Sequence, residues 1–183
     1  MKHKNLPKFN MEGSMHFVTT KTFQNQPFFC NEICCRILIE ELDFYRDKYN
    51  FKIFGFVIMP DHLHLLLWFD IEKYPDMTIS KIIQVIKIMT AKRVKRFLFY
   101  DRSNSWVDDL TSNHLPRKFI FWQKGFYDFN IFHYKKFIEK LNYIHKNPFK
   151  ESKIKSPENY FYSSFSFLET GKGVLWVDQP TMQ

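Results

Sequence analysis

The pattern of apolar and polar residues in the first part of the chain predicts a strand followed by a helix. Residues 14–20 are β-prone and apolar at their centre, which favours a strand. A polar, turn-like segment over 24–27 follows it. From Asn31 to about Tyr49 apolar residues recur at helical spacing with charges between them, so we expect an amphipathic helix that Asn31 caps.

The middle of the chain predicts a β-hairpin and a long helix. Residues 51–59 and 62–69 are two apolar runs separated by Pro60 and Asp61, a pair typical of a turn. Thr78 stands where it could cap the helix that follows. Its inward stripe is expected to consist of Ile79, Ile82, Ile83, Ile86, Thr90, Val94 and Phe97.

The last part of the chain predicts a loop, a strand, a helix and a tail. Residues 101–116 resemble a loop, and 118–122 have strand character. A helix should run from about His133 to Asn147, because Pro148 disfavours the α conformation in the residue before it. The aromatic residues of the tail are expected to pack on the body as anchors: Tyr160, Phe161, Phe165 and Trp176.

The order strand, helix, strand, strand, helix, strand, helix predicts an α+β fold. A ferredoxin-like antiparallel sheet covered by helices, with an extra C-terminal helix, fits this order. The chain has 183 residues and no linker rich in Gly, Pro or Ser. We therefore expect a single domain over 1–183, with a core at about 14–150 and a tail at 151–183.

The charge balance points to a nucleic-acid partner. Lys and Arg number 27 against 19 Asp and Glu, a formal net charge of +8, which favours attraction to a polyanion. Cations crowd the long helix after Thr78, and Lys92, Arg93 and Arg96 are candidate phosphate contacts. A solvated helix face is the alternative interpretation of each of these residues.

Three features predict a cytoplasmic protein, associated with the nucleoid if DNA is its partner. No segment reaches the roughly 18 to 20 apolar residues that span a bilayer. Residues Met1 to Asn10 are polar and basic and lack the apolar region of a secretory signal. Cys30, Cys34 and Cys35 form an odd, clustered set that suits reduced thiols better than disulfides.

Two histidines open the second strand of the hairpin, as His62-Leu63-His64. Residues two apart on a strand project from the same face, so both imidazoles point one way. Such a pair is suited to clamp a metal ion. The alternative is a pair of core histidines with other hydrogen-bond partners, since burying two unpartnered imidazoles would be costly.

The last helix offers a tyrosine and an amide to complete such a site. Tyr143 and Asn147 lie four residues apart and so share a helix face, which Lys136 and Lys140 flank. The two side chains could meet a metal together. The alternative is a packing role for Tyr143 and a helix-terminal role for Asn147.

These residues lie within motifs that resemble a known family. The motifs are Met-Pro-Asp-His-Leu-His-Leu-Leu-Leu from Met59, His-Phe-Val-Thr from His16, Phe-Trp-Gln-Lys-Gly-Phe-Tyr-Asp from Phe121 and Tyr-Ile-His-Lys-Asn-Pro from Tyr143. In order and spacing they are similar to the single-tyrosine HUH transposases, which include the REP-associated tyrosine transposases and their insertion-sequence relatives. The resemblance covers about residues 14 to 150.

The resemblance implies an activity and a role for each site residue. It implies Mg²⁺ or Mn²⁺ at His62 and His64 and single-stranded DNA, usually beside a hairpin, as the substrate. Tyr143, rather than Tyr127, would be the nucleophile, and the product would be a 5′-phosphotyrosyl enzyme. Asn147 would be the third ligand, although several insertion-sequence relatives have Gln there. Lys136 and Lys140, beside the nucleophile, would contact the DNA.

Other functions and assemblies are compatible with the sequence. A basic domain rich in aromatic residues could bind single-stranded nucleic acid without cutting it, which would leave the two histidines unexplained. A metal-dependent nuclease could use water, with Tyr143 only packing. Insertion-sequence relatives work as dimers with shared sites and REP-associated ones can act alone, so a homodimer and a monomer both remain open.

Overall fold

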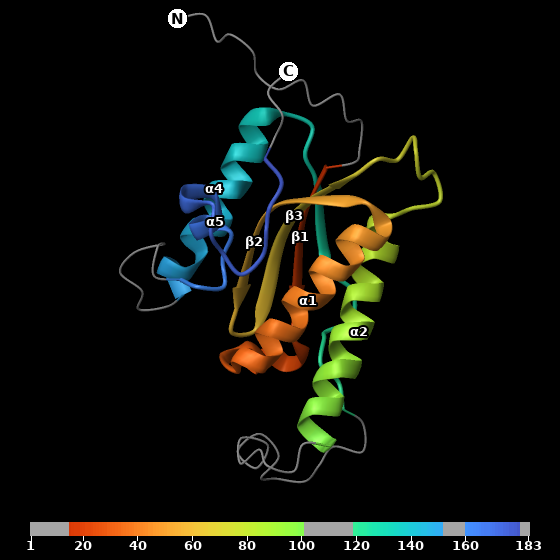
Figure 1. Cartoon of the computed structure of the whole chain (residues 1–183), viewed down its shortest axis with the longest axis vertical. Helices are drawn as coiled ribbons and strands as arrows, with labels where there is room; N and C mark the ends of the chain where they lie inside the picture. Colours follow the sequence, from red (N-terminus) through yellow and green to blue (C-terminus); the bar gives the residue numbers. More distant parts are fainter. Residues whose placement is uncertain (1–14, 101–118, 152–159, 180–183) are drawn as a thin grey trace, which may run out of the picture.

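The computed structural model describes residues 15–100, 119–151 and 160–179 (Figure 1). Its strands are β1 (Met15–Lys21), β2 (Phe51–Met59), β3 (His62–Phe69) and β4 (Tyr127–Asn130). Its α-helices are α1 (Glu32–Tyr49), α2 (Ile79–Tyr100), α4 (Tyr134–Glu151) and α5 (Phe165–Thr170). Two short 3-10 helices, Phe23–Asn25 and Phe28–Cys30, connect β1 to α1 where the sequence predicts a turn. The predicted loop at 101–116 lies outside the described residues.

The strands form one antiparallel sheet in the order β2-β3-β1-β4. Together with the chain order β1-α1-β2-β3-α2-β4, this is the ferredoxin-like arrangement that the sequence predicts. α4 is the additional C-terminal helix. Among the described residues, none of the helices combines the length and hydropathy that a bilayer crossing requires.

The predicted caps account for the starts of the two long helices. The Asn31 side chain accepts a hydrogen bond from the Ile33 amide at 2.8 Å. The Thr78 hydroxyl accepts one from the Lys81 amide at 3.2 Å. Each cap satisfies a backbone N–H group that has no partner inside the helix.

Helices cover both faces of the sheet (Figure 1). The larger apolar core lies between the sheet and the pair α1 and α2, and the smaller one lies under α4. β3 contributes to both cores because its side chains alternate between the faces. Leu63, Leu65 and Leu67 belong to the larger core, whereas His62 and His64 lie on the α4 side.

The strand predicted at 118–122 is wrong. Trp122 makes only an isolated bridge to Thr22, and the fourth strand is β4, a few residues later. Phe121 and Trp122 are buried against Phe28 and Phe29, so their apolar character reflects packing of an irregular segment. β4 is a short, largely exposed edge strand and lacks the alternation that marks a half-buried strand.

The predicted end of the last helix at Asn147 is also wrong, because α4 continues through Pro148 to Glu151. A proline removes one backbone donor and crowds the preceding turn. Here it falls in the final turn, and its ring is buried. Burial of the ring offsets the cost of the lost hydrogen bond.

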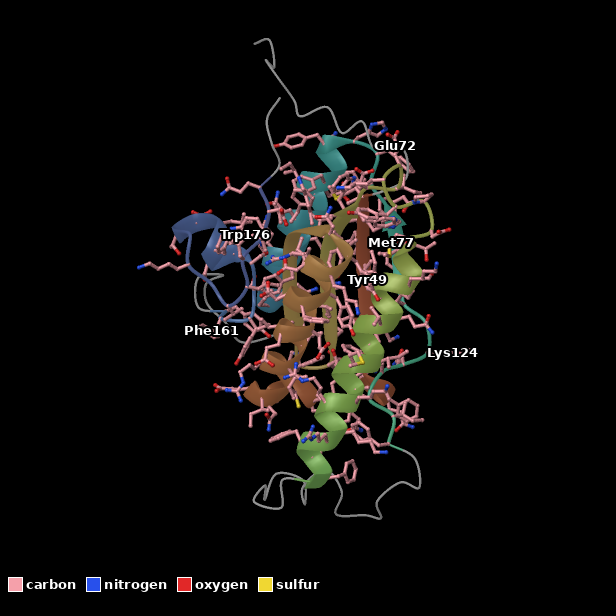
Figure 2. The ribbon with its side chains drawn as sticks, turned by 45° about the vertical axis from the view of Figure 1, so that its right-hand side comes forward. Tyr49, Glu72, Met77, Lys124, Phe161 and Trp176 are labelled. Atoms are coloured by element: carbon pink, nitrogen blue, oxygen red, sulfur yellow. The ribbon has the colours of Figure 1, made fainter. Side chains whose placement is uncertain are left out.

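The C-terminal segment, residues 160–178, packs on the body as predicted, and two of the four expected anchors, Tyr160 and Phe165, contact it. Its buried apolar side chains are Leu175 and Val177. Phe161 and Trp176, which the sequence suggests as anchors, project outward (Figure 2) and are 66% and 53% exposed. The Trp176 ring instead receives the Arg46 guanidinium at 5.0 Å from its centroid.

The three cysteines are free thiols, as expected. Cys34 and Cys35 are buried in α1, and burial raises the pKa of each thiol to about 12. These two thiols are therefore neutral packing groups under ordinary conditions.

Candidate active site

The start of β3 places the two histidines together on the α4 side of the sheet. His62 and His64 are 5% and 4% exposed, and their ring centroids lie 4.8 Å apart. The hairpin turn before them is fixed by the Thr22 amide, which donates to the Asp61 carbonyl at 2.8 Å. This backbone bond holds the first residues of β3 in place.

Each imidazole has a hydrogen-bond partner at its Nδ1 atom. His62 Nδ1 lies 2.6 Å from the Asp61 carboxylate, and His64 Nδ1 lies 2.7 Å from the Thr19 hydroxyl. A carboxylate can only accept, so His62 carries its proton on Nδ1. Carboxylate or hydroxyl partners at Nδ1 are typical of histidines that use Nε2 as a metal ligand.

His64 is held in its neutral form. Burial lowers the pKa of His64 to about 3, and the nearby charges of His62, Lys21 and Lys140 act in the same direction. A neutral imidazole keeps a lone pair, which a metal ligand requires.

α4 brings Asn147 to His64. The Asn147 Nδ2 atom lies 2.8 Å from His64 Nε2, so it donates to that nitrogen. This bond leaves the proton of His64 on Nδ1, where Thr19 accepts it. Asn147 is 2% exposed, and its Oδ1 atom is buried without a hydrogen-bond partner among the described residues. Such an orphaned oxygen is an unusual arrangement for a packing residue.

These donors fit a divalent metal ion. Within the described part of the chain, no group of three His, Cys, Asp or Glu side chains could hold a metal. Asn147, whose amide lies 2.8 Å from His64 Nε2, is therefore a candidate for a third protein ligand beside His62 and His64. A half-turn of the Asn147 amide exchanges Nδ2 for Oδ1 and directs an oxygen toward His64 Nε2.

Tyr143 lies one helical turn before Asn147 and faces the same histidine. Its ring packs edge-on against His64 with the centroids 5.1 Å apart, and against Phe17 at 5.8 Å. The side chain is 39% exposed, so it is within reach of a ligand in solvent. Tyr127, on β4, is 54% exposed and contacts Phe17, and none of its described ring contacts involves a histidine.

The candidate DNA contacts fall into two groups on opposite sides of the sheet. Lys140 lies beside the site, with its Nζ atom 4.7 Å from the Phe17 ring centroid and 5.9 Å from that of Tyr143. Lys136, one turn earlier, forms an ion pair with Glu139 at 2.6 Å. The charge of Lys140 therefore lies next to the tyrosine, whereas Lys136 is paired with a carboxylate.

The other group lies on α2, across the sheet from the histidines. Arg93 is bound to Glu40 and, at 2.9 Å, to the buried Glu41 of α1. Lys92 and Arg96 are exposed. Lys92 and Arg96 are therefore accessible to solvent, while Arg93 serves the contact between α1 and α2.

Two contributors to the site were missed by sequence reasoning. Thr19 and Phe17 lie on β1, in register beside β3, and contact His64 through a hydrogen bond and a stacked ring at 5.4 Å. The alternation of residues 15–19 could have placed both on one face. The antiparallel pairing of β1 with β3 was the information that was lacking.

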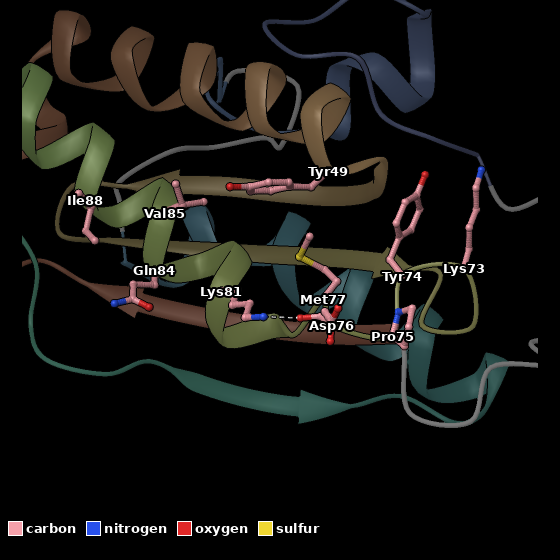
Figure 3. Close-up of a pocket in the computed structure, with 10 residues that line it drawn as sticks. All are labelled: Tyr49, Lys73, Tyr74, Pro75, Asp76, Met77, Lys81, Gln84, Val85 and Ile88. Carbon is pink, nitrogen blue, oxygen red and sulfur yellow. Dashed lines mark hydrogen bonds between the residues drawn. The ribbon is translucent and has the colours of Figure 1, made fainter.

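A hollow elsewhere on the surface is separate from this site. It has a volume of about 570 Å³ and lies between the end of α1, the segment after β3 and the start of α2, with Tyr49, Tyr74 and Met77 in its wall (Figure 3). The histidines are at the other end of β3 and on its other face. The hollow therefore takes no part in the arrangement around His64.

Sequence comparison identifies the family to which the chain belongs. The family model described as "Transposase IS200 like" matches residues 11–147. The match spans most of the chain, so the chain belongs to the IS200-like transposase family, which also confirms the resemblance noted in the sequence.

One solved structure supports the fold, and a second is similar to a lesser degree. A REP-associated tyrosine transposase bound to a REP hairpin matches with a TM-score of 0.61 and 17% identity, over 99% of this chain and 93% of that chain. A crystal structure of a candidate transposase from Deinococcus radiodurans matches with a TM-score of 0.45 and 15% identity, over 80% of this chain and 97% of that chain. No curated protein matches the chain.

Proposed function

We propose that this transposase cleaves and rejoins single-stranded DNA through a covalent 5′-phosphotyrosine at Tyr143, with a divalent metal ion. The observation that carries the proposal is the contact of Tyr143 with His64, at 5.1 Å between ring centroids, beside the orphaned Oδ1 of Asn147. Tyr143, which is 39% exposed, thus lies beside the buried side chains that we propose as metal ligands.

His62, His64 and Asn147 would hold the metal, which we propose to be Mg²⁺ or Mn²⁺. Asp61 and Thr19 fix the imidazoles by accepting from their Nδ1 atoms. When bound, the ion would polarise a non-bridging phosphate oxygen and help to orient the scissile phosphate. The oxygen of an amide and two imidazole nitrogens suit such an ion.

Tyr143 would supply the attacking oxygen. Its phenolic oxygen gives up its proton to solvent and forms a bond to phosphorus, while the bond from phosphorus to the 3′ oxygen breaks and the departing 3′ oxygen takes up a proton from solvent. Lys140, whose Nζ atom lies 5.9 Å from the Tyr143 ring centroid, supplies positive charge where negative charge develops. The reverse reaction with another 3′-hydroxyl rejoins the strand, and no nucleotide cofactor is needed.

We propose single-stranded DNA beside a hairpin as the substrate. The REP-associated relative is described with a REP hairpin bound, and this chain carries a net charge of +8. Lys140 and Lys136 would contact the strand near Tyr143, and the exposed Lys92 and Arg96 would contact phosphates on the α2 side.

Adduct formation tests this proposal. The full chain is incubated with Mg²⁺ and a single-stranded library that carries a fixed hairpin, labelled at either end. The label 3′ of the nick should migrate with the protein, and the other fragment should end in a hydroxyl. Tyr143→Phe should abolish the adduct while metal and DNA binding persist, because it removes one oxygen and little volume.

Tyr127→Phe is the matched control and should keep most of the activity. An adduct that persists in Tyr143→Phe would identify another nucleophile, with Tyr127 as the first candidate. Cleavage by the wild type without any adduct would assign the attack to water. Binding without divalent-dependent cleavage would favour a non-catalytic binding module.

A further inference from the structure

Apolar contacts seat α4 on the sheet. Phe137 and Ile144 are buried in the smaller core. Leu141 fills the space next to Gly55 of β2. A larger residue at position 55 would collide with it, because its Cβ atom would lie 2.6 Å from Leu141 Cδ1. Apolar contacts are not directional. They fix how closely the helix approaches the sheet, but they leave it able to roll about its own axis.

The residues around Tyr143 occupy different sides of the helix. Successive residues are rotated by about 100°, so Tyr143 and Asn147 share one flank and Ile144 points into the core. His145 then lies on the opposite flank from Tyr143. A directional contact at His145 would therefore resist a roll that carries Tyr143 away from His64.

His145 makes such a contact with the C-terminal segment. Its Nε2 atom lies 3.0 Å from the hydroxyl of Ser164, which is fully buried. Its ring packs edge-on against Phe165 of α5, with the centroids 5.3 Å apart.

Ser164 is itself fixed to the sheet. Its amide donates to the Phe56 carbonyl at 2.9 Å, and its hydroxyl accepts from the Phe56 amide at 3.0 Å. Tyr162 continues this pairing along the outer edge of β2, where its carbonyl accepts from the Ile58 amide at 2.9 Å. The hydrogen bond from His145 therefore connects α4 to the edge of the sheet rather than to a loose tail.

We propose that His145 and Ser164 are positioning residues that set the roll of α4 and so hold Tyr143 against His64. The inference rests on the proposed role of Tyr143 as nucleophile. α4 is then held on both flanks, by Asn147 at the histidines and by His145 at the C-terminal segment. Reactions that depend on alignment can lose about 100-fold in rate when a group is misplaced by about 1 Å.

The test measures the single-turnover rate of adduct formation at saturating DNA, with the full chain, Mn²⁺ and the labelled hairpin library. His145→Leu should slow this rate by about 10- to 100-fold. The dissociation constants for DNA and Mn²⁺ should stay within about 3-fold, since His145 is not among the side chains that we propose to bind either partner. His145→Gln, which offers a nitrogen near the position of Nε2, should restore most of the rate.

Asp178→Ala is the matched control. Asp178 also bonds the C-terminal segment to β2, with its carboxylate accepting from the Ile53 amide at 2.9 Å, but it makes no described hydrogen bond to α4. This variant should lower the melting temperature and leave the adduct rate unchanged. If His145→Leu fails to fold, Ser164→Ala takes its place with the same expectations.

Two results would overturn the inference. One is an unchanged rate in a folded His145→Leu. The other is an equal loss of rate in His145→Leu and Asp178→Ala, which would indicate a general loss of stability. A wild-type chain that forms no adduct at Tyr143 would instead refute the proposed function, so the two failures are distinguishable.

Discussion

The two faces of the sheet are built from the same strands but have opposite characters. Toward α1 and α2, the strands present a large apolar core. Toward α4 they present a smaller core that borders buried polar groups, including His62, His64 and Asn147. Strand β3 contributes side chains to both faces, because leucines and histidines alternate along its first residues.

The difference shows how the fold separates stability from chemistry. The apolar face gains free energy from burial, at about 25 cal/mol per Å² of apolar surface. On the α4 face each buried polar group requires a partner, and Thr19, Asp61 and Asn147 supply partners to the imidazoles. The remaining orphan, Asn147 Oδ1, marks the place where a ligand would complete the set.

Removing a histidine should have the largest effect on function. His62→Ala and His64→Ala are each expected to abolish divalent-dependent cleavage, since each removes an imidazole ligand. The fold should persist because both side chains lie at the edge of the smaller core. Mn²⁺ titration and circular dichroism would check these outcomes. Unfolded variants, together with a wild type that binds no Mn²⁺, would favour core histidines instead.

A substitution at Leu65, the residue after His64 on β3, should reduce stability but leave metal binding and cleavage intact. Leu65 is fully buried in the larger core. Leu65→Ala should lower the free energy of unfolding by about 2–5 kcal/mol. Below its melting temperature the folded protein should still bind Mn²⁺ and form the adduct. Loss of Mn²⁺ binding at full folding would mean that the two faces are coupled.

Acid should weaken the α4 face specifically. Burial lowers the pKa of His64 to about 3 and that of His145 to about 4, from an ordinary value of 6.5. Between about pH 6.5 and pH 4 the unfolded chain binds protons that the folded chain does not, so stability falls as pH decreases through this window.

Urea unfolding of the metal-free protein at pH 7 and pH 4.5 measures this effect. His145→Leu lacks one of the two imidazoles whose pKa burial lowers, and it should lose less stability over the same interval. An identical loss in the wild type and in the variant would exclude His145 as a source of the acid sensitivity.

The smallest effect is expected from the cations of α2. Replacing Lys92 and Arg96 with Ala should flatten the slope of log affinity for DNA against log salt by about 1.4 to 1.8 units. Arg93→Ala should mainly lower the melting temperature, because it leaves the buried Glu41 without its arginine. A slope that does not change in the double variant would place the DNA away from α2.

The sequence predicts the parts of the molecule that depend on local pattern. The hairpin of β2 and β3, the caps Asn31 and Thr78 and the shared face of Tyr143 and Asn147 follow from periodicity and capping chemistry. These features need no knowledge of distant contacts. The structure places Tyr143 against His64, as the shared motif suggests.

The sequence fails where long-range packing decides the outcome. The aromatic run ending at Trp122 is buried without forming a strand, and the exposed β4 forms a strand by pairing with β1. Pro148 stays helical because its environment buries it. The contact of His145 with Ser164 joins residues from separate elements, so no local pattern could indicate it.

The alternation along β3 also limits which changes in length the gene can tolerate. A deletion or insertion of one residue within His62–Phe69 would rotate every later side chain to the other face. Leucines would then enter the polar site and a histidine would enter the large core. Substitutions in this strand can be tolerated one at a time, but a change of length by one residue would damage both faces at once.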